Sequence, residues 1–311
     1  MFTSNTYKSL SQSNQQHMRH YIFLFVLLPS LTINAQLKGK ILNIDSREPI
    51  PFANIAIENT IFGTTSNVKG SFQFKEVTAD KRLVISSVGF ETQYLSISDT
   101  VVEILLQHKT YEIDLVTVKP PRNRITTRVN EIPSRNSSNH LFCNGYPWMS
   151  ARYFEYKTAY QNCPFIKEIR VLTHSQIEGS KFNIRIFSAN DKGEPSEEII
   201  GENIIVSTPK GNHIVTVDLT YLNLIFPENG LFVALEWLII DENKRNYVYK
   251  MKGEKGKRHE IRYDPKFGAF SMKGRIIIWS YSGGRWIQSS FEDQLHPGKN
   301  LDLAIELVLS E

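Results

Sequence analysis

The chain has 311 residues, of which 41% are hydrophobic and 22% are charged, so it is long enough for about two domains with buried cores. Its formal net charge is only +4 and no basic block dominates, so the composition does not imply a nucleic-acid partner. The sequence contains no low-complexity tract and no repeat of fixed period.

The first predicted element is a targeting signal. From Met18, a short basic start precedes an apolar stretch over residues 21–28, and small or polar residues then continue to Ala35. A membrane-spanning helix needs roughly 20 apolar residues, so we predict instead a secretory signal that is cleaved after Ala35. A membrane anchor is the alternative. Residues 1–17 form an upstream extension if translation begins at Met18, and the mature protein is expected in the periplasm or at the outer membrane.

Alternating apolar and polar residues follow and predict about seven short strands in a β-sandwich over residues 36–118. Asn67 and Gly70 bracket a tight turn, because Asn can bond its own backbone and Gly tolerates positive φ. Phe72 and Phe74 then share one face, which indicates a half-buried strand. Asn67 and Gly70 are therefore interpreted as structural.

Four motifs lie in this region, namely Pro-Ile-Pro-Phe-Ala-Asn (49–54), Gly-Thr (63–64), Gly-x-Phe (70–72) and Ser-Val-Gly-Phe (87–90). Together they resemble the carboxypeptidase-regulatory-like domain, a transthyretin-like sandwich also found at the front of TonB-dependent receptors. Asn67 departs from the Asp that is usual in the family. The resemblance implies an accessory domain and not a peptidase. None of the eight histidines is followed by Glu at the third position, so no zinc motif, metal or cofactor is expected.

Residues 119–140 are rich in Pro, Arg and polar side chains, and they are predicted to form a linker or a strap across the surface. Residues 141–311 contain at least eight alternating segments and no helical pattern, which predicts a jelly-roll-like β-sandwich. This block also resembles, less specifically, a β-sandwich that often follows the regulatory-like domain in exported bacterial proteins. The expected fold class is therefore all-β.

Two charged side chains are predicted on otherwise apolar strand faces. Glu236 shares its face with Phe232 and Ala234, where a lone carboxylate is costly. Arg185 occupies the corresponding position on another strand, so a buried structural ion pair of Arg185 with Glu236 is the favoured interpretation. The alternative is a glycan hydrolase that uses Glu236 and a second carboxylate, such as Asp241, Glu292 or Asp293.

Four aromatic residues are candidates for ligand binding. Trp279 and Tyr281 precede a predicted Ser-Gly-Gly turn and Trp286 follows it, while Trp148 lies in a separate segment. Sugars stack on aromatic faces, so these rings are candidates for a glycan site. The alternative is that they fill the end of the sandwich, since aromatic side chains dominate core burial.

Two further features depend on export. Cys143 and Cys163 would close a loop of about 20 residues, and a disulfide there would stabilise by roughly 3 kcal/mol, whereas two buried thiols are the alternative. The basic stretch over residues 250–267 either meets anionic lipid or polysaccharide or is simply a solvated loop.

These features predict an exported protein without catalytic activity, in a binding or structural role with an envelope protein or a glycan as its partner. Exposed sheet edges of the first sandwich are candidate docking surfaces through strand addition. The alternatives are the glycan hydrolase and an accessory module of a TonB-dependent uptake system. No nucleic acid, cofactor or metal is expected, and peripheral membrane association stays open.

Overall fold

A computed structural model describes residues 37–74, 81–96, 101–110, 125–134, 137, 139–146, 148–251, 253, 255–274, 278–293 and 296–311. The predicted signal, the segment 113–118 and the first part of the predicted linker lie outside these ranges. Residues Gln36–Glu311 form one compact unit. No helix within the described ranges is long and apolar enough to cross a membrane.

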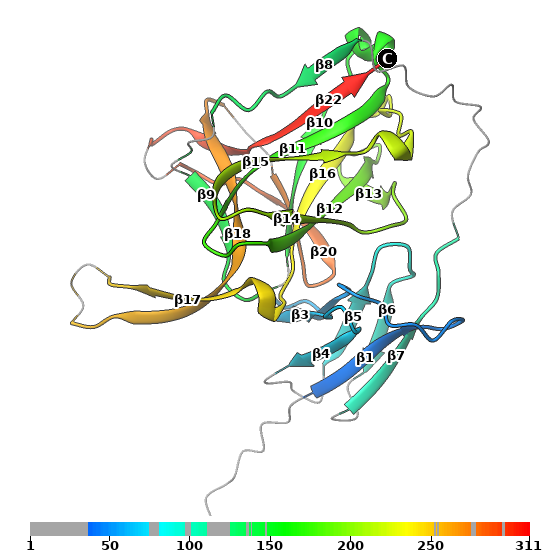
Figure 1. The fold of residues 1–311 in the computed structure, drawn as a ribbon, viewed down its shortest axis with the longest axis vertical. Coiled ribbons are helices and arrows are strands. Elements are labelled where there is room, and N and C mark those ends of the chain that lie inside the picture. The colour runs from blue at the N-terminus through cyan, green and yellow to red at the C-terminus, as the bar shows by residue number, and fades with distance from the viewer. Residues whose placement is uncertain are drawn as a thin grey trace, which may run out of the picture. The chain divides into compact units, whose positions relative to one another are not determined.

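The N-terminal sandwich has seven strands in two sheets (Figure 1). They are β1 (Leu37–Asn43), β2 (Asn54–Ile57), β3 (Gly63–Thr65), β4 (Ser71–Phe74), β5 (Arg82–Ser86), β6 (Gln93–Ser96) and β7 (Val101–Leu106). One sheet has the order β4-β1-β7 and the other β3-β2-β5-β6. Alternate residues such as Ile41, Ile55, Phe72 and Ile85 meet between the sheets in one apolar core, as the period-two pattern requires.

The turn before β4 has the backbone geometry that its residue types favour. Gly70 adopts a φ of +71°, which costs a residue without Cβ little. The Asn67 side-chain oxygen accepts hydrogen bonds from the backbone N–H groups of Lys69 at 2.9 Å and Ser71 at 3.1 Å. Asn67 and Gly70 therefore fix the reversal that leads into β4.

The C-terminal sandwich is also built from strands alone, apart from three short 3-10 helices in the described part. Its strands are β8 (Thr126–Val129), β9 (Asn139–Cys143), β10 (Met149–Phe154), β11 (Phe165–Ser175), β12 (Ser180–Ala189), β13 (Pro195–Glu198), β14 (Ile204–Thr208), β15 (Gly211–Asp218), β16 (Leu231–Trp237), β17 (Lys244–Tyr249), β18 (Arg258–Met272), β19 (Ile278–Ser282), β20 (Arg285–Ser289), β21 (Asn300–Leu303) and β22 (Ile305–Ser310). The 3-10 helices are η1 (Thr158–Asn162), η2 (Thr220–Leu222) and η3 (Asp241–Asn243).

These strands form two sheets that enclose the largest apolar core of the chain. The first sheet follows the order β13-β12-β16-β10-β19-β20, with β14 also paired to β12, and the second follows β17-β18-β11-β22-β8 with β15, β21 and β9 attached. Leu235, Trp237, Phe182 and Phe267 are fully buried between them. The all-β prediction, with one sandwich at each end of the chain, is confirmed.

Part of the predicted linker is a strand. β8 pairs antiparallel with β22 along Thr126–Val129, so this segment extends the second sheet. Arg128 donates to both carboxylate oxygens of Glu306, at 2.6 and 2.9 Å, and the Ile132 N–H donates to the same carboxylate at 2.9 Å. The sequence pattern did not indicate this strand, because it is only four residues long and lies among Pro and polar residues. It is held by the Arg128 ion pair rather than by buried apolar side chains.

Candidate functional site

The site begins with a sheet that is covered on both sides. In β16, Leu231, Val233, Leu235 and Trp237 face the main core, while Phe232 and Ala234 lie on the opposite face in a second apolar cluster. Glu236 continues that opposite face and is only 3% exposed. Every residue of β16 is buried. Trp279 of the β19–β20 hairpin packs against Phe232, and Glu236 is covered from outside the C-terminal sandwich.

The N-terminal sandwich provides this cover, and we call the contact zone the junction. The Ile239 N–H donates to Thr65 Oγ1 at 3.0 Å. A Cβ on Gly283, at the tip of the β19–β20 hairpin, would lie 2.4 Å from the Thr60 carbonyl oxygen. Asn54 and Ser86, which are paired between β2 and β5, hydrogen-bond to Glu236 and Tyr281 across the junction.

A buried ion-pair cluster lies at the centre of the junction. Arg185 donates from Nε and Nη2 to the two carboxylate oxygens of Glu198, at 2.6 and 2.9 Å. Its Nη1 lies 3.6 Å from Glu236 Oε1, and Asn183 Nδ2 donates to Glu236 Oε2 at 3.0 Å. The structure thus brings Arg185 and Glu236 together and adds Glu198, which the sequence pattern does not single out.

The pKa directions follow from this arrangement. Burial raises the pKa of Glu236, although the nearby Arg185 charge and the Asn183 donor work in the opposite direction. For Arg185, burial favours loss of the proton, but the Glu198 and Glu236 carboxylates outweigh it, and the pKa of the guanidinium is raised. Arg185 is therefore held as a cation between two carboxylates.

The predicted aromatic residues separate into two groups. Trp286 is cross-strand from Tyr281 in the β19–β20 hairpin, and its ring packs edge-on against Phe187 with centroids 5.1 Å apart. Trp279, on the same hairpin, packs against Phe232. Trp148 lies apart from the hairpin and stacks on the buried Trp237, with centroids 4.4 Å apart. The ligand interpretation of Trp148 gives way to a packing role, because its ring supports the main core.

A pocket of about 370 Å³ opens beside the ion-pair cluster, and we call it the junction pocket. It is lined by Ser86, Ser87, Phe90, Glu91, Thr92, Lys109, Met149, Arg185, Phe187, Ser196, Glu197, Glu198, Tyr281 and Trp286. The Ser87 side chain is 5% exposed, and its hydroxyl has no hydrogen-bond partner among the described residues. The pocket therefore brings together two predicted ligand residues, Tyr281 and Trp286, with a buried hydroxyl from the Ser-Val-Gly-Phe motif.

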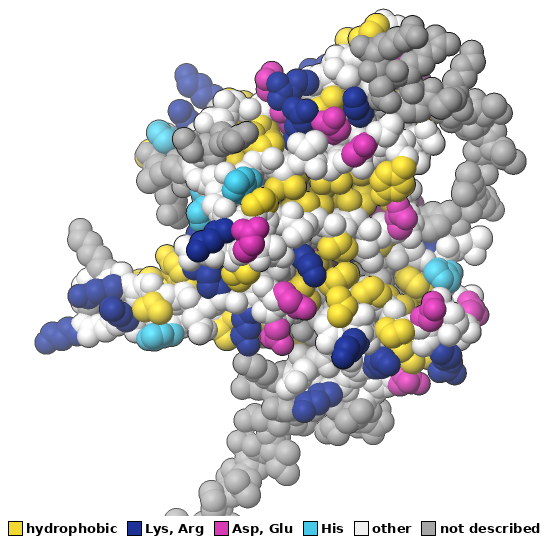
Figure 2. Space-filling view, viewed as in Figure 1, with side chains coloured by type: hydrophobic (Ala, Val, Ile, Leu, Met, Phe, Trp, Pro, Cys, Tyr) yellow, Lys and Arg dark blue, Asp and Glu magenta, His cyan; other side chains and the backbone are white. Residues whose placement is uncertain are grey.

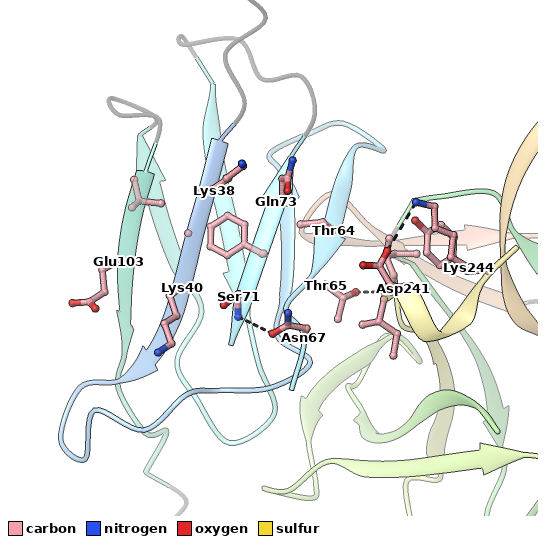
Figure 3. Close-up of a pocket in the computed structure, with 16 residues that line it drawn as sticks. Lys38, Lys40, Thr64, Thr65, Asn67, Ser71, Gln73, Glu103, Asp241 and Lys244 are labelled. Atoms are coloured by element: carbon pink, nitrogen blue, oxygen red, sulfur yellow. Dashed lines mark hydrogen bonds and ion pairs between the residues drawn. The ribbon is translucent and has the colours of Figure 1, made fainter. Parts of the chain in front are cut away.

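A larger and more open groove of about 720 Å³ lies elsewhere along the junction (Figure 3). Lys38 and Lys40 of β1 and Ser71 and Gln73 of β4 line one side, and Asp241 faces them from the C-terminal sandwich. Within the described residues, β4 pairs on one side only, with β1. This groove has polar and apolar lining and mixed charge, and an open strand edge borders it.

Ser, His and Asp side chains converge at Ser271, His296 and Asp293. Ser271 and His296 both hydrogen-bond to the buried Asp293 carboxylate, with His296 Nδ1 at 2.8 Å. His296 uses the same nitrogen toward Ser271, at 3.4 Å, so the imidazole does not bridge serine and aspartate through its two nitrogens as a catalytic triad requires. Among the described residues, no group of three His, Cys, Asp or Glu side chains could hold a metal ion.

Of the two alternatives for the cysteines, a disulfide or two buried thiols, the structure has the thiols. Cys143 and Cys163 are both free and buried. Cys143 Sγ donates to the Tyr146 carbonyl oxygen at 3.1 Å, whereas Cys163 Sγ accepts from Thr127 Oγ1 at 3.7 Å. Burial raises the pKa of Cys143 to about 12, so this thiol stays protonated and packs as a small apolar group.

Comparison with known proteins finds a family that is similar to the region of the first sandwich. Residues 37–118 match the model of the CarboxypepD_reg-like domain. A curated relative, TonB-dependent receptor P3 of Formosa agariphila, is 25% identical over 113 residues, which are 35% of this chain and 11% of the receptor. The chain thus spans about a tenth of the length of this relative.

Two solved structures of infectious bursal disease virus were also found. The Gx strain structure gives a TM-score of 0.21 at 7% identity, and the VP2 subviral particle gives 0.22 at 8%, each covering 88% of this chain and 63% of the viral chain. At these TM-scores neither likeness bears on the fold or function here. The family match stands on its own: residues 37–118, which include the strands of the N-terminal sandwich, are similar to the CarboxypepD_reg-like domain family.

Proposed function

We propose that this chain is an exported, non-catalytic protein of the cell envelope that binds a glycan in the junction pocket. The observation that carries the proposal is the composition of this pocket, in which four aromatic rings lie with four hydroxyl side chains and an ion-paired Arg185. Apolar C–H faces of a sugar suit the rings, and its hydroxyls suit the hydroxyl and carboxylate groups. The size of about 370 Å³ suits one or two sugar units.

The charges of the pocket favour a particular class of sugar. Glu91, Glu197 and Glu198 contribute three carboxylates, while Lys109 and Arg185 contribute two cations. Lys109 pairs with Glu197, and Arg185 donates two hydrogen bonds to Glu198 and lies 3.6 Å from Glu236. Both cations of the pocket are therefore ion-paired, which favours a neutral sugar or an amino sugar over an acidic one.

The envelope context rests on the relative. TonB-dependent receptor P3 is a receptor by name, and 113 residues of this chain align with it. Together with the predicted secretory signal, this supports a periplasmic or outer-membrane location. A role as an accessory module in TonB-dependent uptake is compatible with the same observations.

A glycan array tests the proposal. Residues 36–311 are expected to bind neutral or amino sugars and to leave uronic and sulfated sugars unbound, because the pocket offers acceptors and both of its cations are ion-paired. Folding is checked on the same sample by circular dichroism. Folded protein that binds no printed glycan, or binds only acidic ones, would overturn the proposal.

The groove of Figure 3 supports a second candidate function, which is binding of an extended segment of an envelope protein. The supporting observation is the open edge of β4 beside the groove, since an added strand would complete its backbone hydrogen bonds. A bound strand would protect the backbone amides of β4 from hydrogen exchange in the presence of an envelope extract. Unchanged exchange across Ser71–Phe74 would rule this function out.

The hydrolase alternative rested on Glu236 as a carboxylate without a partner, and the geometry does not support that premise. Glu236 lies against Arg185, Asn183 and Asn54, so its carboxylate is used within the junction. Among the described residues, its carboxylate neighbour is Glu198, which is itself held by Arg185 through two hydrogen bonds. Both carboxylates are committed to one guanidinium, and a general acid needs a free carboxyl group facing its substrate.

A further inference from the structure

A second surface lies away from the junction pocket, on the hairpin formed by β17 and the first part of β18. We call residues 244–263 the basic arm. Figure 1 shows these two strands extending from the second sheet beyond the neighbouring strands. Figure 2 shows dark blue side chains gathered over the same hairpin, with yellow ones between them.

The arm concentrates the positive charge of the protein. Residues 244–263 contain eight Lys or Arg and two Glu, a net charge of +6, whereas the whole chain carries +4. The remainder of the chain is therefore slightly acidic. A positive field concentrated on one projecting hairpin favours contact with an anionic surface at that place.

The arginines at the base of the arm serve its structure. The Arg262 guanidinium lies over the Tyr247 ring at 3.7 Å and over the Phe142 ring at 4.1 Å. Arg245, the cross-strand partner of Arg262, has its guanidinium 5.3 Å from the Tyr247 ring and 3.5 Å from Asp264. These cation–ring contacts stiffen the hairpin, and they leave the lysines as the outward charges.

The tip combines exposed lysines with exposed apolar side chains. Lys250, Lys255 and Lys257 are exposed, while Val248 is 45% and Met251 44% exposed. A binding surface for a dissolved polyanion needs only the cations. Apolar side chains between them are typical of a surface that enters the boundary between lipid headgroups and acyl chains.

We propose that the tip of the basic arm binds the surface of a membrane that contains anionic phospholipid. The lysine ammonium groups lie at the lipid phosphates, and Val248 and Met251 enter the interface beneath them. The arm thereby holds an exported, otherwise slightly acidic protein on the membrane surface. This inference does not depend on the glycan pocket, because the two surfaces share no residue.

Sedimentation with vesicles tests the proposal. Residues 36–311 are expected to bind vesicles with about one third phosphatidylglycerol and not vesicles of phosphatidylcholine alone, and added salt is expected to release the protein. Replacing Lys255 and Lys257 by Glu is expected to lower binding by at least about tenfold. Met251→Ser, which keeps every charge, is expected to lower it by about threefold.

The matched control changes charge by the same amount elsewhere. Lys38 and Lys40 are exposed on β1, at the groove of Figure 3, and their double replacement by Glu is expected to leave vesicle binding nearly unchanged. Absence of wild-type binding to anionic vesicles would overturn the proposal, as would equal loss in both double variants. Unchanged binding of Met251→Ser would show attraction by charge alone and contradict the inserted tip.

Discussion

Replacement of Arg185 by methionine is expected to lower the free energy of unfolding by about 3–5 kcal/mol, because it leaves two carboxylates without their shared cation. Glu236 is only 3% exposed, so it cannot regain solvent without opening the junction. Thermal and urea unfolding of the variant measure the change. A loss below about 1 kcal/mol would contradict the role of Arg185 as the centre of this cluster.

The pH dependence of the same variant tests whether the unpaired carboxylates, Glu236 among them, cause the loss of stability. Burial raises the pKa of Glu236 in the folded protein, and Arg185 counteracts it, so removing Arg185 raises this pKa further. A carboxyl with a raised folded pKa stabilises the fold in its protonated form, at low pH, and this stabilisation is lost as the pH rises through that pKa. The deficit of Arg185→Met is therefore expected to be largest at neutral pH and to shrink on acidification.

The matched control is Arg82→Met. Arg82 makes a similar two-bond contact with Glu58, at 2.7 and 2.6 Å, but its side chain is 53% exposed. Water replaces the lost contact there, so the unfolding temperature is expected to change little. An equally large loss in both variants would show that arginine removal acts through something other than burial.

Replacement of Trp237 by alanine is expected to lower the free energy of unfolding by about 3–5 kcal/mol. The indole is fully buried, stacks on Trp148 and lies 4.4 Å, centroid to centroid, from the Phe267 ring. Its Nε1 donates to the Pro265 carbonyl oxygen at 2.7 Å. Chemical denaturation measures the loss, and a variant within about 1 kcal/mol of the wild type would contradict this description of the core.

Trp237→Phe separates packing from the hydrogen bond. It keeps most of the ring contacts with Trp148 and Phe267 but leaves the Pro265 carbonyl without its donor. A smaller loss of about 1–2 kcal/mol is expected. If Phe and Ala variants lost equal stability, the hydrogen bond rather than the stack would dominate at this position.

The fold follows from the sequence to the extent that local alternation determines it. Period-two patterns and turn residues such as Asn67 and Gly70 indicate strands without knowledge of their partners. The same alternation cannot tell which face of β16 lines the sandwich core, because both faces are buried. The sequence pattern therefore predicts that Glu236 lies in the core of the C-terminal sandwich, although it lies on the opposite face, against the N-terminal sandwich.

The site could be predicted only in part, because it depends on contacts between distant segments. Tyr281 and Trp286 stand out as aromatics around a Gly-Gly turn, whereas Trp148, a ligand candidate from a separate segment, packs on the core. Glu198 lies in a stretch that reads as a polar turn. Its role follows from the pairing of β13 with β12, opposite Phe187, which no local pattern encodes.

The most direct test of glycan binding in the junction pocket is a calorimetric titration of the array's strongest sugar into wild type, Trp286→Ala and Trp279→Ala. The two tryptophans share one hairpin and are both half-buried, but only Trp286 lines the pocket. The proposal predicts about tenfold weaker binding for Trp286→Ala, equivalent to about 1.4 kcal/mol, and nearly unchanged binding for Trp279→Ala. Equal affinity of all three proteins, or loss only in Trp279→Ala, would contradict it.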